Sequence, residues 1–221
     1  MISIVTCPAF AQDPASDGDK APTDEKSMHD KMHGPTKLIA MIHPVGESGV
    51  KGSVSFEKVA DGVKVTANVH GLEPNSKHAF HVHEFGDLGS ADATSAGDHF
   101  NPDGHDHGLP DKDMRHSGDL GNLEADGDGN ATRELTVKNL KLDHGSNGIL
   151  GRAVIIHAKE DDGGQPSGNA GDRIGAGVIG ISKDGMPNAE KKAEAEKSAT
   201  DTKPDIQDAT APSGAADTPS E

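Results

Sequence analysis

The alternation of apolar and polar residues in short runs most constrains how this chain can fold. In the clearest run, Val63, Val65, Ala67 and Val69 alternate with polar residues. A period of two places such apolar residues on one face of an extended strand. Further short runs, separated by turn residues, occupy 38–42, 53–57, 78–85, 123–125, 131–137, 151–157 and 174–181. Because no core segment has a credible helix period, we predict an all-β antiparallel sandwich or barrel of about eight strands.

Composition argues against two classes of protein. No apolar run approaches the ~20 residues of a membrane-spanning helix, so no membrane span is expected. The net charge is −16 and Lys and Arg do not cluster, so nucleic acid is not an expected partner. Aromatic residues make up only 2% of the chain. The core must therefore be built from Val, Ile, Leu and small residues.

Residues 1–11 predict an export signal peptide or its remnant. The segment is mildly apolar and closes on Ala9-x-Ala11, a small-residue cleavage pattern. Its basic start is missing, so two alternatives stay open: a frayed apolar N-terminus, and a lipid-modified Cys7. We expect an exported protein, either periplasmic or secreted. Cys7 is the only cysteine, and cleavage after Ala11 would leave a chain with neither a thiol nor a disulfide.

Two acidic segments without an apolar period flank the expected folded domain, residues 36–182. Residues 12–35 are predicted to be a disordered tether and residues 183–221 a disordered tail, because such compositions cannot repay the entropy cost of ordering. Within the tether, the stretch Met28-His29-Asp30-Lys31-Met32-His33 can bind a soft metal such as copper loosely. A solvated tether is the preferred interpretation of this stretch.

Six histidines differ from the others because they are spaced as a set: His81, His83, His99, His107, His116 and His157. His81 and His83 lie two residues apart, so a strand would present both side chains on one face. The next three fall in residues 86–118, a long Gly-, Asp- and Pro-rich segment that Asp119 follows. Such long loops are usually functional, and imidazoles with a carboxylate suit a divalent metal. His105 is an alternative ligand to His107.

Five stretches around these residues resemble the copper–zinc superoxide dismutase family. They read HAFHVHEFGD at 78–87, SAGDHFNP at 95–102, RHSGDLGN at 115–122, GNAGDR at 168–173 and GVIGI at 177–181. The likeness extends over about residues 37–182. It implies a Greek-key β-sandwich or barrel with two long functional loops. It also implies an enzyme that disproportionates superoxide to dioxygen and hydrogen peroxide by copper redox cycling beside a structural zinc.

The resemblance also implies a role for each residue of the site. His99 would be shared between the metals, with one ring nitrogen for each, and would exchange a proton when it releases copper. Asp161 would hydrogen-bond one ligand of each metal, and Arg173 would attract and orient the superoxide anion. The implied copper ligands are His81, His83, His99 and His157, and the implied zinc ligands are His99, His107, His116 and Asp119.

The chain departs from the family in ways that bear on function. Ala93 and Ala176 stand where the family carries its cysteine pair, so no intrachain disulfide is expected. The loop between His157 and Arg173 is short and lacks the expected charged residues, which predicts weak steering of the anion. The alternative function is a non-enzymatic zinc-only protein, or a copper buffer or carrier, on the same fold. Residues 177–181 resemble the segment that packs the family's dimers, which favours a homodimer.

Overall fold

The computed structural model describes residues 34–186. The predicted export signal, most of the predicted tether with its 28–33 stretch, and the tail beyond residue 186 lie outside the described residues. Among those described, no helix has both the length and the apolar character to span a bilayer.

Eight strands make up the described domain, together with two single-turn 3₁₀ helices, η1 (Thr94–Ala96) and η2 (Lys183–Gly185). Each apolar run of the sequence corresponds to one strand, although the runs 78–85, 123–125 and 151–157 extend one or two residues beyond theirs. The predicted run 123–125 belongs to a longer strand that begins at Asp119, because Asp119 pairs with His81 of the neighbouring strand. The strands are β1 (Lys37–Pro44), β2 (Lys51–Val59), β3 (Gly62–His70), β4 (Lys77–His83), β5 (Asp119–Glu124), β6 (Ala131–Val137), β7 (Ala153–His157) and β8 (Arg173–Ile181).

The strands form one sheet in the order β5-β4-β7-β8-β1-β2-β3-β6, and neighbouring strands are antiparallel. The end strands β5 and β6 approach each other, so the sheet is a nearly closed barrel. β1, β2 and β3 are consecutive neighbours. The chain then crosses to β4, and β7 later inserts between β4 and β8, which is Greek-key connectivity. The predicted fold class is confirmed.

The core fills the inside of this barrel with the apolar residues that the alternation predicted. Val63, Val65, Ala67 and Val69 of β3 are each no more than 2% exposed, and the lysine and threonine between them are only partly buried. Phe56 and Phe80 are fully buried and are the largest core side chains. Small and branched residues supply most of the rest, as the low aromatic content requires.

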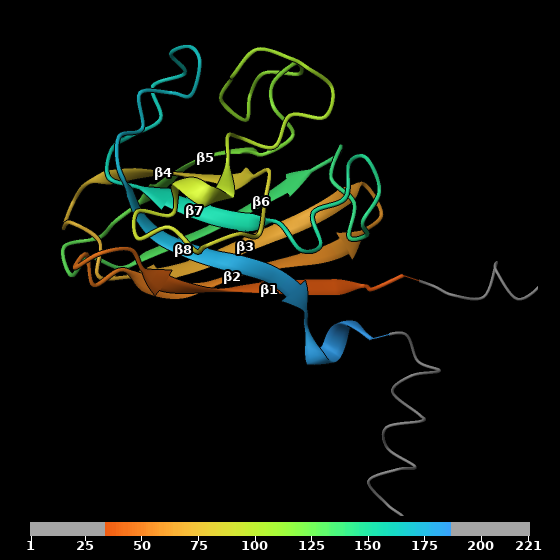
Figure 1. Ribbon diagram of the computed structural model, residues 1–221, viewed down its shortest axis with the longest axis horizontal. Helices are drawn as coiled ribbons and strands as arrows, with labels where there is room; N and C mark the ends of the chain where they lie inside the picture. The colour runs from red at the N-terminus through yellow and green to blue at the C-terminus, as the bar shows by residue number, and fades with distance from the viewer. Residues whose placement is uncertain (1–33, 187–221) are drawn as a thin grey trace, which may run out of the picture. The chain divides into compact units, whose positions relative to one another are not determined.

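β4 is buried on both faces, and this positions the candidate site. Phe80 and Val82 point into the core, while His81 and His83 lie on the outer face and are also buried. Two long loops cover that outer face. One runs from β4 to β5 and the other from β7 to β8, and Figure 1 shows both beyond the layer that holds β4, β5 and β7.

Candidate metal centre

Two strands and one loop bring the first group of histidines together. His81 and His83 come from β4, and His157 ends the neighbouring strand β7. His99 comes from the long loop, where an isolated antiparallel bridge pairs it with His83. These four residues each offer a ring nitrogen, and the four atoms lie within 4.8 Å of one another. The Nε2 atoms of His83 and His157 are 3.4 Å apart, the ~3.3–3.4 Å expected between neighbouring ligands of a four-coordinate metal.

The hydrogen bonds of these rings determine which nitrogens are free. His83 Nδ1 lies 2.9 Å from the Gly97 carbonyl oxygen, and His157 Nδ1 lies 3.2 Å from that of Gly171. A ring nitrogen facing a carbonyl must carry the proton, so Nε2 of each ring keeps its lone pair. His81 donates from Nε2 to Asp161 over 3.0 Å, and its Nδ1 is buried without a hydrogen-bond partner. Unpartnered buried nitrogens that converge in this way fit a metal ion.

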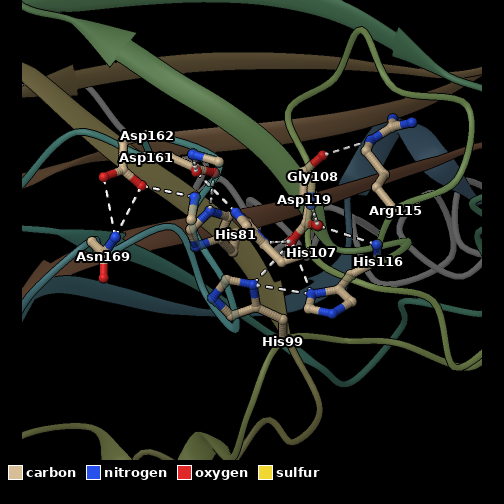
Figure 2. Close-up of polar contacts among 12 residues, drawn as sticks. His81, His99, His107, Gly108, Arg115, His116, Asp119, Asp161, Asp162 and Asn169 are labelled. Carbon is tan, nitrogen blue, oxygen red and sulfur yellow. Dashed lines mark hydrogen bonds and ion pairs between the residues drawn. The ribbon is translucent and has the colours of Figure 1, made fainter.

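The second group is arranged around the carboxylate of Asp119 (Figure 2). Its Oδ1 atom lies 2.9 Å from His99 Nδ1, 3.0 Å from His107 Nδ1 and 3.3 Å from His116 Nδ1. His107 Nδ1 makes no hydrogen bond despite this short distance. The other oxygen, Oδ2, accepts the backbone N–H groups of Gly108 and His116. Oδ2 is thus engaged, and Oδ1 faces three imidazoles as a metal-ligating oxygen would.

Asp161 connects the two groups by hydrogen bonds to the ring nitrogens of His81 and His107 that point away from the clusters. Its Oδ2 accepts from His81 Nε2 at 3.0 Å, and its Oδ1 accepts from His107 Nε2 at 2.9 Å. Asp161 is 1% exposed, and its position is held by a bond from its backbone N–H to Asn122 Oδ1. One carboxylate therefore orients a ring in each group and leaves the Nδ1 atom of both rings facing its own cluster.

Burial and carboxylates shift the pKa values of these residues in opposite directions. Burial lowers the pKa of His81 to about 4 and those of His83 and His157 well below the ordinary value. Burial also disfavours charge on His107, but Asp119 and Asp161 outweigh it and raise the pKa of this ring to about 9. The histidines around Asp119 hold its carboxyl pKa far below its usual range, against the effect of burial. His81, His83 and His157 are thus neutral, whereas the second group contains a charged carboxylate.

Arg173 lies at the rim of the cleft that opens onto the first group. It shares this cleft with His83, His99 and His157, and residues 166–167 and 170–171 of the β7–β8 loop line the side. Its guanidinium donates to the carbonyl oxygens of Ala93 and Gly97. A small anion that enters the cleft meets a cation next to the histidines.

The structure brings together every metal ligand that the resemblance implied. Among the described residues, the two groups found are those predicted, with His99 in both, and His105 belongs to neither. Ala93 and Ala176 are both buried in one small apolar cluster.

Two residues near the site were not predicted. His78, which is not one of the six jointly spaced histidines, is buried, and its Nδ1 atom lies 2.9 Å from the His157 carbonyl oxygen. Gln165 bonds the backbone of His107. No sequence pattern marks either residue, because both contacts join segments distant in the chain.

Four imidazoles suit copper, and three imidazoles with one carboxylate suit zinc. The fold and this donor set define a class: an antiparallel β-barrel protein with two adjacent groups of metal-ligating side chains that have one histidine in common.

Comparisons with known proteins define the family. A family model described as copper/zinc superoxide dismutase (SODC) matches residues 50–179. A protein named superoxide dismutase [Cu-Zn] from Paramecium bursaria Chlorella virus 1 is 46% identical over 157 residues, which cover 68% of this chain and 81% of the viral protein. One of the same name from Neurospora crassa is 43% identical, over 66% of this chain and 99% of its own length. The crystal structure of the clock protein EA4 superimposes with a TM-score of 0.62 at 41% identity, over 68% of this chain and 98% of that one.

The chain belongs to the copper/zinc superoxide dismutase family. It is an oxidoreductase that disproportionates superoxide to dioxygen and hydrogen peroxide, with copper and zinc as cofactors.

Proposed function

We propose that the two histidine groups divide the metals of this superoxide dismutase between them. The first group would hold copper through His81, His83, His99 and His157. The second would hold zinc through His99, His107, His116 and Asp119. The observation that carries the proposal is the position of His99. Its Nδ1 faces Asp119 and His116 at 2.9 and 3.4 Å, so its Nε2 is left for the first group.

The assignment of copper and zinc follows from the donors. Zinc is redox-inert and accepts a tetrahedral set that includes a carboxylate, whereas an all-imidazole set accommodates copper in both oxidation states. Copper, when bound, supplies the one-electron chemistry that oxidises one superoxide to dioxygen and reduces another to peroxide. The asymmetry in charge supports this division, because Asp119 adds a negative charge only to the second group.

The chain's own residues would bind the anion and deliver a proton. Arg173 attracts superoxide to the cleft and orients it beside the first group. His99 takes a proton on Nε2 when that nitrogen is free and gives it to the reduced oxygen species. Two protons are consumed for each dioxygen and hydrogen peroxide formed, and the second proton comes from water in the open cleft.

The proposal is tested by removing one ligand that belongs to the copper group alone. His157→Ala should abolish superoxide consumption while zinc stays near one ion per chain, because His157 does not belong to the second group. Metal content by elemental analysis and superoxide consumption by stopped-flow absorbance are measured on the same samples. Retained activity in a His157→Ala protein that has lost its copper would contradict the assignment, as would the loss of zinc with copper retained.

An exported location remains a prediction from residues 1–11. The small-residue pattern Ala9-x-Ala11 supports it. Sequencing the N-terminus of the mature protein recovered from periplasm or medium should give Gln12 as the first residue. A protein that stays in the cytoplasm with Met1 intact would contradict export.

Self-association is proposed from an exposed apolar patch, here called the β8 patch: Met41, Phe85 and Val178. Each of these side chains is 44–56% exposed. β1 pairs with β8 such that Ala40 faces Ile179 and His43 faces Ala176, so Met41 lies across from Val178. A Cβ added to Gly86, next to Phe85, would lie 3.1 Å from Val178 Cγ1. The patch thus draws on β1, β8 and the start of the β4–β5 loop, and an apolar surface of this kind suits a two-fold dimer interface.

A further inference from the structure

The position of Arg173 depends on the first part of the β4–β5 loop, residues 86–97. Its Nη2 atom donates to the Gly97 carbonyl oxygen over 2.7 Å, and its Nη1 atom donates to that of Ala93. The same Gly97 oxygen accepts from His83 Nδ1 at 2.9 Å. Any shift of this loop backbone therefore moves the guanidinium relative to a ligand of the first group.

This part of the loop has little apolar packing to hold it. It contributes Ala93 and Ala96 to a small cluster with Ala153, Ile155 and Ala176, and its partly buried Leu88 packs against that cluster. Ala93 is 3% exposed and adopts a left-handed conformation with φ of 57°. A residue with a Cβ in that region is strained, and the strain persists only where surrounding contacts determine the backbone. Polar contacts add to this small apolar cluster in fixing the loop.

Ser90 and Ser95, one on each side of Ala93, provide polar contacts of this kind. The N–H of Ser95 donates to Ser90 Oγ over 2.8 Å, and the N–H of Ser90 donates to Ser95 Oγ over 3.2 Å. Ser90 Oγ also donates to Ser95 Oγ at 3.1 Å, and Ser95 Oγ donates to the carbonyl oxygen of Asp87 at 2.9 Å. Each hydroxyl thus accepts the other residue's backbone N–H, which closes residues 90–95 into a loop around Ala93.

The segment inside the serine pair is tied further by its own backbone and by Asp92. The Ala93 N–H donates to the Ser90 carbonyl at 3.1 Å, and the Ala96 N–H donates to the Ala93 carbonyl at 3.2 Å. The Thr94 hydroxyl donates to Asp92 Oδ1 at 2.7 Å. The Ala93 carbonyl oxygen that receives Arg173 therefore sits at the centre of a hydrogen-bonded turn.

We infer that Ser90 and Ser95 are positioning residues for Arg173: their reciprocal hydrogen bonds hold the Ala93 and Gly97 carbonyls that aim the guanidinium into the cleft. Because positions 93 and 176 are both alanine, no disulfide can fix the loop backbone there. The hydrogen bonds of the two serine hydroxyls fix it instead. The inference rests on the proposed role of Arg173 as the anion-binding cation.

A double-mutant cycle between Ser95 and Arg173 tests the inference. In protein loaded with copper and zinc, Ser95→Ala should weaken azide binding and lower the superoxide rate constant by about fivefold each, the factor of one neutral hydrogen bond. Metal content should not change. In an Arg173→Ile background, Ser95→Ala should have no further effect, because the group that it positions is gone. Ser95→Thr keeps the hydroxyl and should restore azide affinity, and Ser146→Ala, in an exposed distant turn, is the matched control.

Hydrogen exchange in metal-free protein measures the order of the loop independently of enzyme activity. In metal-free protein, amide hydrogen exchange across residues 93–97 should speed up several-fold in Ser95→Ala and stay unchanged in Ser146→Ala. Equal losses from Ser95→Ala with and without Arg173 would show a general structural effect and overturn the inference. So would unchanged azide affinity in Ser95→Ala while Arg173→Ile weakens it. If Arg173→Ile itself leaves azide affinity unchanged, the proposed role of Arg173 is wrong instead.

Discussion

At the scale of single residues, the site depends on close contacts that leave no room for a side chain. Gly168 has a φ of 74°, and a Cβ at this position would collide with Asp161 Oδ1 and lie 2.8 Å from His107 Nε2. The loop thus passes directly over the carboxylate that orients one ring of each metal group. Glycine is required here both for its backbone conformation and for this approach.

We expect Gly168→Ala to lower zinc affinity by about 10–100-fold, the usual cost of disturbing a group that orients metal ligands. Zinc affinity is measured by competition with a chelator. Gly46→Ala is the matched control, since Gly46 has a φ of 60° but nothing within 4 Å of an added Cβ. The Gly46→Ala variant carries the cost of placing a Cβ in the left-handed region, about 1 kcal/mol, without the collision. Equal zinc affinities in the two variants would show that the contact with Asp161 is unimportant.

At the scale of elements, one side chain joins the two long loops. The His107 N–H donates to Gln165 Oε1 over 3.1 Å, and Gln165 Nε2 donates to the His107 carbonyl oxygen over 2.8 Å. The backbone N–H and C=O of His107 are therefore both hydrogen-bonded to the β7–β8 loop. A ligand of the second group is held by a loop that also lines the cleft of the first.

Gln165→Ala should accelerate zinc release to a chelator by about 25-fold, because it removes two hydrogen bonds, each worth about fivefold, from the backbone of the proposed zinc ligand His107. Gln165→Glu keeps the acceptor for the His107 N–H but places a second oxygen against the His107 carbonyl oxygen. Zinc release from Gln165→Glu should therefore be at least as fast as from Gln165→Ala. Ser167→Ala, in the same loop and exposed, should behave as the unmodified protein. Zinc release that is equal in Gln165→Ala and Ser167→Ala would rule out this link between the loops.

At the scale of the whole molecule, the apolar surface is distributed unevenly. The β8 patch gathers three of the five exposed large hydrophobic residues on the described domain, and the other two are Ile181 and Met114, which is 74% exposed. A charge placed in a buried dimer contact loses its hydration without gaining a partner, whereas a charge on a free loop remains solvated.

Phe85→Glu with Val178→Glu should therefore produce monomers at micromolar concentration, as measured by sedimentation velocity, while superoxide consumption per loaded chain stays within about twofold. Met114→Glu introduces the same kind of charge outside the β8 patch and should remain dimeric. A monomeric unmodified protein, or a double variant that still dimerises, would refute the proposed interface.

Local patterns in the sequence and the family resemblance were sufficient to predict the strands and the two groups of side chains that converge in the fold. A period of two specifies which face of a strand is buried, so Val63 to Val69 and the His81–His83 pair could be placed before any contact was known. The stretches around the remaining histidines and Asp119 resemble the family, and this resemblance extended the set of proposed ligands beyond His81 and His83. Tertiary structure alone decided which ring nitrogen is free, that β5 begins at Asp119, and that Gln165, Ser90 and Ser95 fix the loops. Loops have no period, so their positions are set by hydrogen bonds between segments far apart in the chain, and spacing along the sequence does not encode those contacts.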